Sequence, residues 1–197
     1  MNVDDSPMKT HLPTNAAQQG GFTLLELMVA LTILSMMLLA GLPSFTTFLR
    51  NAEIRSTSES ISNGLRIARS EATRLNRPVS FTLSGGGNPD WTINIFNPVT
   101  GLLLQPALQS YSRFEVGRSA RVVTTPGNAV AVTFNGLGRI ISPSPIATPN
   151  LQQIDITSVI AGEAKTLRVF ADDLRGVRVC DPDPALRIMT PPDARAC

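Results

Sequence analysis

Residues 22–42 constrain this chain more than any other feature, because they form one almost wholly apolar run. About 21 residues in a helix are enough to cross the ~30 Å hydrocarbon core of a bilayer. Glu26 is the one charged residue in the run, and a carboxylate at that depth is costly unless it is neutralised or paired. We therefore expect a transmembrane helix in which Glu26 needs a partner.

The segment before the run, residues 1–21, is polar and ends in Gly21. An ordinary secretory signal has its small-residue cleavage site after the apolar stretch. Here the expected cut follows Gly21 and precedes the apolar stretch, so the stretch would remain in the mature protein. An internal start at Met8 would give a shorter leader with Lys9 near its tip. The competing interpretation is an uncleaved single-pass anchor whose Glu26 reaches the membrane interface.

The composition disfavours catalysis. The chain has one histidine, His11, and two cysteines, Cys180 and Cys197. A Ser-His-Asp or Cys-His site would have to use His11, and a zinc site would lack ligands. The formal net charge of +2 neither requires nor excludes a nucleic-acid partner. We therefore expect a chain that is not an enzyme and that has no cofactor and no metal site.

After the apolar run, Pro43 is expected to kink the helix without ending it, because helical periodicity resumes at once. Mostly apolar residues recur there at spacings of three and four, which gives a stripe along one helix face. The stripe consists of Ile54, Ser58, Ile61, Leu65, Ala68, Ala72 and Leu75. Pro78 restricts Arg77 and ends the helix after Asn76. The pattern predicts one kinked helix of about 55 residues, roughly 80 Å long, whose second half, residues 43–77, packs on a globular head.

Beyond Pro78 the hydrophobic period changes to two, which is the period of half-buried strands. The expected strands cover residues 79–83, 91–95, 102–104, 121–124, 130–134, 139–141, 151–157, 166–170 and 177–180. A glycine-rich loop, residues 84–89, joins the first two as a hairpin, and Asn135-Gly136 is a strong type I′ turn signal. The sequence therefore predicts an α+β fold in which residues 78–197 form an antiparallel β head on the helix.

Cys180 and Cys197 bracket a proline-rich tail, residues 181–196. In an oxidising periplasm the two cysteines would form a disulfide. Closing a loop of this size stabilises a fold by about 3 kcal/mol in the chain-entropy model. The alternative is a pair of free thiols in a cytosolic protein. The expected membrane span favours the disulfide, because a head beyond the span would lie outside the cytoplasm.

The hexapeptide Gly-Phe-Thr-Leu-Leu-Glu at residues 21–26 resembles the prepilin processing motif of type IV pilins and type II secretion pseudopilins. The resemblance implies that a prepilin peptidase cuts between Gly21 and Phe22 and that the new amine of Phe22 is N-methylated. It also makes Glu26 the fifth residue of the mature chain. Since the freed amine lies one helical turn from Glu26, the carboxylate of one subunit can neutralise the amine of a neighbour inside a filament.

Three further segments are similar to the GspH/FimT family of minor pilins and pseudopilins, namely residues 58–78 and, more weakly, 134–139 and 174–180. This resemblance implies a type IV pilin-like fold and a minor pilin that primes filament assembly. The implied location is the inner membrane, crossed once, with the head in the periplasm. The implied partners are the prepilin peptidase, the inner membrane and other pilins or pseudopilins. The alternative from the same family is a pseudopilin of a type II secretion machine.

Some members of this family bind DNA during natural transformation, and this chain has a group of arginines near its C-terminus. Arg168, Arg175 and Arg178, with Arg187, could form a basic patch for phosphates. The competing interpretation is a solvated strand edge in which these arginines pair with nearby acids. Those acids are Asp172, Asp173, Asp181 and Asp183.

Overall fold

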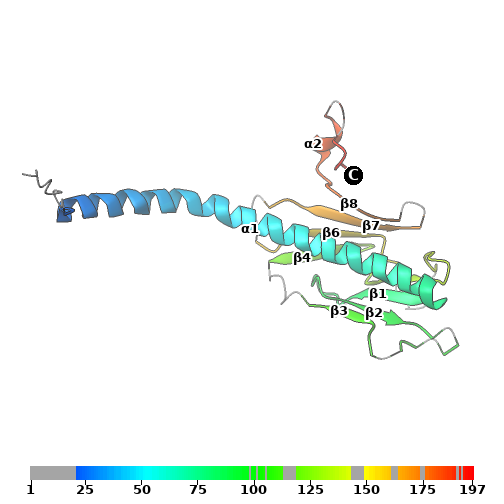
Figure 1. Cartoon of the computed structure of the whole chain (residues 1–197). Coiled ribbons are helices and arrows are strands. Elements are labelled where there is room, and N and C mark those ends of the chain that lie inside the picture. The colour runs from blue at the N-terminus through cyan, green and yellow to red at the C-terminus, as the bar shows by residue number, and fades with distance from the viewer. Residues whose placement is uncertain are drawn as a thin grey trace, which may run out of the picture. The chain divides into compact units, whose positions relative to one another are not determined.

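The computed structural model describes residues 21–97, 99–100, 102–104, 106–112, 119–142, 149–160, 164–173, 176–189, 191 and 193–197. The chain forms two compact units that divide between Leu42 and Pro43, and each unit is described by itself. The first unit carries the N-terminal part of a long helix. The second unit carries the remainder of that helix together with the strands (Figure 1).

The predicted long helix is confirmed as α1 (Leu24–Leu75, 52 residues), which continues through Pro43. It ends in a Schellman arrangement, in which a left-handed residue lets the chain leave the helix while the last carbonyl groups stay bonded. Asn76 supplies the left-handed conformation with φ 49°, and the N–H of Arg77 donates to the carbonyl oxygen of Ala72 at 3.2 Å. The helix therefore stops within one residue of the end expected from Pro78.

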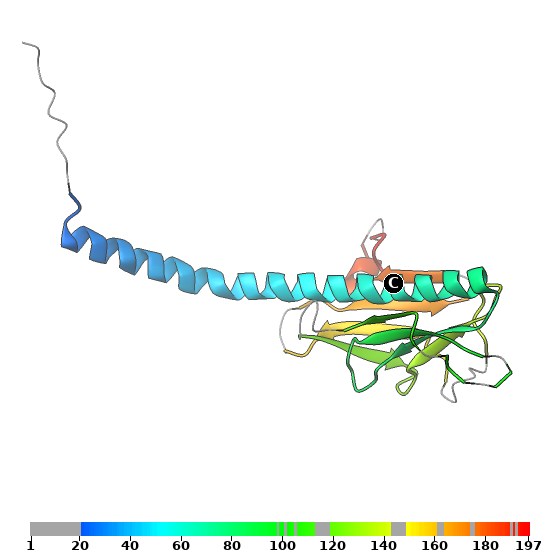
Figure 2. The same ribbon diagram turned by 60° about the horizontal axis from the view of Figure 1, so that its bottom comes forward.

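Within the described residues, the strands of the second unit form two antiparallel sheets of four strands each. The first has the order β3-β2-β1-β5 and contains β1 (Val79–Leu83), β2 (Trp91–Ile95), β3 (Gln109–Tyr111) and β5 (Ala131–Phe134). The second has the order β4-β6-β7-β8 and contains β4 (Ala120–Thr125), β6 (Gln153–Ser158), β7 (Leu167–Asp172) and β8 (Gly176–Cys180). A short helix, α2 (Pro184–Arg187), follows β8. Figure 2 shows the strands lying along the part of α1 that belongs to the second unit.

Two predicted strands, 102–104 and 139–141, are reduced to isolated bridges, in which Leu103 pairs with Phe96 and Ile140 pairs with Phe134. Backbone hydrogen bonds join each segment to its partner on either side of that one residue pair. Conversely, β3 was not predicted, because its Gln-Ser-Tyr sequence is short and largely polar.

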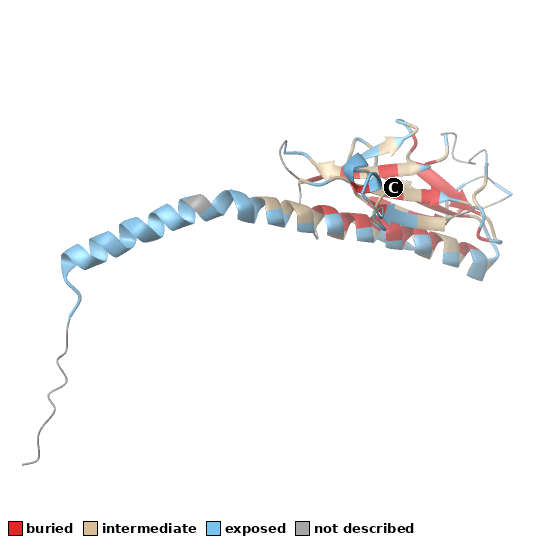
Figure 3. Cartoon of the chain, turned by 90° about the horizontal axis from the view of Figure 1, so that it is seen from above, coloured by how far each residue is buried: buried red, intermediate tan, exposed pale blue. Residues whose placement is uncertain are grey.

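The core forms where α1 packs on the two sheets. The apolar part of the predicted stripe is buried there and comprises Ile54, Ile61, Leu65, Ala68 and Ala72. Their buried partners on the strands include Phe81, Ile93, Val132, Ile154 and Val169. Figure 3 shows the buried residues of α1 in red. Fully burying an aliphatic or aromatic side chain of this size stabilises a fold by about 1.5–3 kcal/mol, so this packing holds the second unit together.

Candidate functional site

The first turn of α1 has the geometry of a capped helix start. The N–H of Glu26 donates to the Oγ1 atom of Thr23 at 3.2 Å, and the N–H of Leu27 donates to the carbonyl oxygen of Thr23 at 3.1 Å. Thr23 is therefore the N-cap residue and Glu26 is the third residue of the helix, which is the spacing of a capping box. A carboxylate at this position also interacts favourably with the positive end of the helix dipole.

The role of Thr23 as the N-cap was not predicted from the sequence. A threonine followed three residues later by a glutamate, just before an apolar run, is the signal by which it can be found. Gly21 and Phe22 lie outside the helix, immediately before the cap. A cut between them would leave Thr23 as the second residue of the new chain, with the cap intact.

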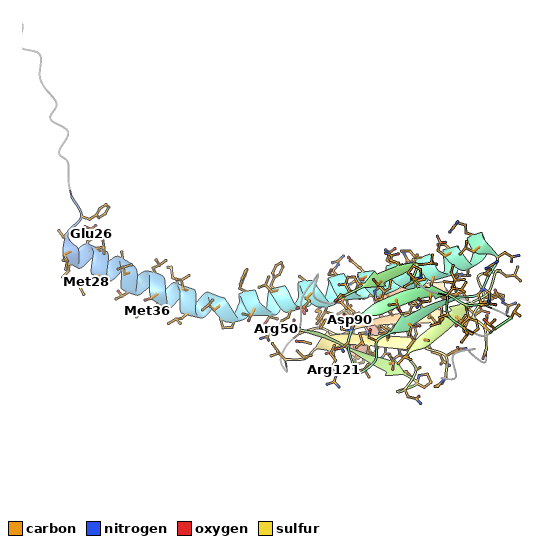
Figure 4. All side chains as sticks on the ribbon, turned by 90° about the horizontal axis from the view of Figure 1, so that it is seen from below. Glu26, Met28, Met36, Arg50, Asp90 and Arg121 are labelled. Carbon is orange, nitrogen blue, oxygen red and sulfur yellow. A yellow bond between two sulfur atoms is a disulfide. The ribbon has the colours of Figure 1, made fainter. Side chains whose placement is uncertain are left out.

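The helix that follows this cap exposes an apolar surface. It contains an 18-residue window with mean hydropathy 2.2, none of which is buried, and it is long and apolar enough to cross a membrane. Met28 and Met36 are among the exposed side chains, and both stand clear of the ribbon in Figure 4. The hydroxyls of Thr32 and Ser35 each donate to a backbone carbonyl oxygen three residues earlier at 2.8 Å. Their polar groups are thus satisfied inside the helix, as an apolar environment requires.

Glu26 is the exception on this surface. Its side chain is exposed, and among the described residues no ion pair reaches its carboxylate. The helix supplies its own partners for the hydroxyl groups but no cation for this charge. The geometry therefore leaves Glu26 able to accept a cation from outside the helix.

The predicted disulfide joins Cys180, at the end of β8, to Cys197, with 5.2 Å between the Cα atoms. It holds the tail beside the strand, where Asp181 and Ala196 form a parallel bridge. The N–H of Asp181 donates to the carbonyl oxygen of Arg195 at 2.7 Å, and the N–H of Cys197 donates to that of Asp181 at 3.0 Å. The tail is therefore held beside the residue that follows β8 by one parallel bridge and the disulfide.

The helix α2 inside this tail was not predicted. Asp183 is its N-cap, and the side chain accepts from the N–H of Ala185 at 2.9 Å. Pro184 follows at the first helical position, where it is well tolerated, and Leu186 is buried. The Asp183-Pro184 pair is the sequence signal for this helix start, although the density of prolines in the tail favours an irregular loop.

The arginines of the proposed basic patch are not equivalent. Arg168 donates from Nε and Nη2 to the two carboxylate oxygens of Asp155, at 2.6 and 2.9 Å, and its Cζ atom lies 5.9 Å from the centre of the Phe170 ring. The hydrogen bond to Asp155 raises the pKa of Arg168. Arg178 is exposed on β8 and Arg187 is exposed on α2, whereas Arg175 lies outside the described residues.

The partner of Arg168 is not one of the acids expected from the sequence. Asp155 lies directly across from Arg168 in the β6–β7 register, and such cross-strand pairs depend on a strand pairing that a sequence does not display. Asp173 instead pairs with Arg139 at 3.1 Å. The backbone N–H of Ile140, followed by Arg139, lowers the pKa of the Asp173 carboxyl. Arg168 is thus already engaged within the protein, and the DNA-binding hypothesis would depend on more exposed arginines such as Arg178.

In the part of the chain that the structure describes, no cluster of three or more His, Cys, Asp or Glu side chains is placed to hold a metal ion. His11, which any histidine-dependent catalysis would use, lies outside the described residues. Two features remain as candidates for function. One is the exposed apolar helix with Glu26, and the other is the second unit, which we call the strand unit, with its disulfide-bonded C-terminal tail.

Two family models match the chain. A prokaryotic N-terminal methylation motif matches residues 17–42, and the model described as type II transport protein GspH matches residues 57–173. A comparison with curated protein sequences found no significant match.

Solved structures of a minor pilin and of a minor pseudopilin share the fold. The type IV minor pilin FimU of Pseudomonas aeruginosa (strain PAO1) is 15% identical with a TM-score of 0.50, over 67% of this chain and 91% of that one. The minor pseudopilin EpsH from the Type 2 Secretion System of Vibrio cholerae is 12% identical with a TM-score of 0.50, over 66% of this chain and 98% of that one. At these identities the likeness concerns the fold alone.

Proposed function

We infer the function of this chain from its family, because it belongs to the family described as type II transport protein GspH, whose model matches more than half of its length. We propose that it is a minor pilin, a structural subunit of type IV pilus assembly that is anchored in the inner membrane by residues 22–42 and holds its strand unit in the periplasm. The observation that carries the proposal is the capped, exposed apolar helix with Glu26 in its first turn.

Processing is the first step of the proposed function. A prepilin peptidase cuts between Gly21 and Phe22, and the new amine of Phe22 is N-methylated. The methylation motif found over residues 17–42 supports this step. A cut at this place precedes the apolar helix, so it frees a positively charged amine without removing the anchor.

Assembly is the second step. In lipid, helices gain little from hydrophobic association, so packing and polar pairs must supply the specificity. A filament neighbour brings its Phe22 amine to Glu26. The two opposite charges then neutralise each other, so neither is left unpaired in an apolar environment. The lack of a partner for Glu26 among the described residues of its own chain supports this assignment.

The second candidate function is that of a type II secretion pseudopilin, which the description of the matching family model favours. Both functions use the same processed helix. They differ in the assembly to which the subunit belongs, so deletion of the gene distinguishes them. Loss of pili or of twitching motility indicates the type IV pilus, and loss of exoprotein release indicates the type II secretion system.

Mass spectrometry of the protein from its native membrane tests the shared part of both functions. We expect a chain that begins at Phe22 and is heavier than the unmodified fragment by one methyl group. A chain that keeps its leader, in cells where other prepilins are cut, contradicts the proposal. A Gly21→Leu variant is the matched control, because it should block the cut while leaving the apolar helix unchanged.

A further inference from the structure

Two segments of the strand unit are tied to α1 near the place where α1 enters that unit. The N–H of Lys165 donates to the Oδ1 atom of Asn51 at 2.9 Å. The N–H of Ser119 donates to Glu53 at 2.8 Å, and the N–H of Val159 donates to the carbonyl oxygen of Ser119 at 2.7 Å. Three points of the strand unit, Ser119 before β4, Val159 after β6 and Lys165 before β7, are thus fixed near the turn of α1 that holds Asn51 and Glu53.

Large apolar side chains are exposed at this end of the second unit. On α1, Phe48 precedes Asn51 by three residues and Leu49 precedes Glu53 by four, so each lies one turn away on the same helix face. After β6, Val159 and Ile160 are exposed as well. We call this set the apolar collar, and it consists of Phe45, Phe48, Leu49, Val159 and Ile160, which are 47–66% exposed.

Basic side chains accompany the apolar collar. Arg50 lies on α1 between Leu49 and Asn51, and Figure 4 labels it at the end of the strand unit where α1 enters. Lys165 is exposed just before β7, where Asn51 accepts its backbone N–H, and its charge also acts on Asp193, the partner of Arg195. The acid nearest to these residues on α1, Glu53, is engaged by the N–H groups of Ser119 and Ala120. Exposed apolar side chains flanked by arginine and lysine are typical of surfaces that bind anionic bilayers.

Chain continuity favours lipid over a protein partner as the occupant. Phe45 follows the last residue of the apolar run, Leu42, by three positions on the same continuous helix. If residues 22–42 span the bilayer, residues 45–50 emerge within about two helical turns of its surface. An apolar group of this size exposed to water needs an explanation in a folded domain, and a lipid surface at this distance along the chain provides one.

We propose that the apolar collar docks on the surface of an anionic bilayer, with Arg50 and Lys165 at the phosphate groups of the lipids. The inference rests on the proposed function, because it requires residues 22–42 to span the membrane. It adds a second membrane contact made by the strand unit. Before assembly, that contact would hold the unit against the bilayer, and a subunit leaving for the filament would have to release it.

The test uses the full chain in vesicles of phosphatidylglycerol and phosphatidylcholine, with the Cys180–Cys197 disulfide intact. An environment-sensitive fluorophore is attached to one added cysteine, Ile160→Cys in the apolar collar or Leu137→Cys at the opposite end. Leu137 is a matched control, since it is 80% exposed and its turn lies beside the C-terminal end of α1, where a Cβ on Gly136 would meet Asn76. A third label, Ile33→Cys, reports whether the apolar helix is in the bilayer.

We expect nitroxide-labelled lipids to quench the fluorophores at residues 33 and 160 but not the one at residue 137. An unquenched label at residue 160 beside a quenched label at residue 33 overturns the docking proposal and leaves the anchor standing. An unquenched label at residue 33 overturns both. A label at residue 160 that is shielded from water but not quenched by lipid indicates a protein partner and also overturns the proposal.

Reversing the charge of Lys165 tests whether the lipid headgroups, and not only the acyl chains, contribute to docking. Replacing Lys165 by glutamate changes two charges, so its effect on docking should exceed the about fivefold change expected for one positive charge near an anionic surface. Arg77→Glu, at the far end of the strand unit, is the control and should leave the quenching at residue 160 unchanged. Equal quenching in the Lys165→Glu variant and the parent chain overturns the assignment of Lys165 to the headgroups.

Discussion

The carboxylate of Glu53, on α1, accepts the backbone N–H of Ser119 at 2.8 Å, directly before β4 begins. It also accepts the hydroxyl of Ser119 and the N–H of Ala120. A strand on the second sheet is thereby fixed to the helix by one side chain. Because carboxylate hydrogen bonds to N–H groups are charge-assisted, they are stronger than neutral ones. The next residue on α1, Ile54, belongs to the buried core, so the contact lies at the edge of that core.

Replacement of Glu53 by alanine should destabilise the second unit by about 1.5–3 kcal/mol, because the variant leaves two N–H groups and a hydroxyl without their acceptor. Chemical denaturation of the detergent-solubilised chain measures the change. Glu59→Ala is the matched control, since Glu59 sits on the same helix in an exposed pair with Arg55 and such pairs contribute about 0.5 kcal/mol. Equal losses for the two variants would contradict the assigned role of Glu53.

Replacement of Gly64 by alanine should cost about 1–3 kcal/mol through overpacking. The added Cβ would lie 2.9 Å from Phe81 Cε2 and 3.0 Å from Trp91 Cζ2, two rings held in the core. This loss would outweigh the gain of up to about 1 kcal/mol that alanine normally brings to a helix interior. Thermal unfolding provides the measurement, and Gly127→Ala, whose Cβ meets nothing within 4 Å, should be close to neutral. A stabilised Gly64→Ala protein would show that α1 can move away from the sheet.

The sequence predicted those features that depend on local pattern or on single strong residues. The long helix, its end near Pro78 and most strand positions follow from periodicity and proline stereochemistry. The disulfide follows from two cysteines in a chain with an expected membrane span. In contrast, the Arg168–Asp155 pair and the Glu53 contact with Ser119 join residues from different elements. They depend on strand register and on helix placement, which no local pattern contains.

Strand β3 is a second feature that local sequence does not predict, because a tertiary contact forms it. Its three residues have no apolar alternation, and Gln109 and Ser110 are exposed. The segment becomes a strand because Tyr111 stacks on Trp91, with ring centroids 5.7 Å apart and planes 11° apart. An aromatic pair across neighbouring strands is a tertiary contact that outweighs weak local propensity.

Acid should loosen the C-terminal tail before it affects the core. The Arg195 side chain, followed by the Arg195 backbone N–H, lowers the pKa of Asp193 to about 2 from the ordinary 3.8. A carboxyl with a lowered pKa stabilises the fold above its ordinary pKa, and the stabilisation is lost as the pH falls toward the folded value. We expect hydrogen exchange at Ala196 and Cys197 to accelerate between about pH 4 and about pH 2, after correction for the intrinsic rate. In Asp193→Asn this pH dependence should disappear; its persistence would place the acid sensitivity elsewhere.

Reduction of the Cys180–Cys197 disulfide should release the tail without unfolding the strand unit. The bond closes a sequence separation of 17 residues, and its removal costs about 3 kcal/mol in the chain-entropy model. The backbone bonds of Asp181 to Arg195 and Cys197 should then open first, because few buried groups support them. Proteolysis after the exposed Arg187 measures tail release, while the exchange of core amides such as Val132 reports on the sheets. Simultaneous loss of protection at both sites would mean that the disulfide supports the whole unit.

The charge of Glu26 can be separated from its place in the helix cap by two substitutions. Glu26→Gln keeps a side chain suited to a capping box but removes the charge, whereas Thr23→Val removes the cap and keeps the charge. If Glu26 neutralises the Phe22 amine of a neighbour, Glu26→Gln leaves that amine unpaired in an apolar environment, at a cost of about 3 kcal/mol or more. We expect Glu26→Gln to insert into the membrane normally but to be lost from sheared filaments, while Thr23→Val enters them with only a modest deficit. Normal incorporation of Glu26→Gln, with loss of Thr23→Val, would assign the glutamate to the helix cap and exclude the intersubunit pair.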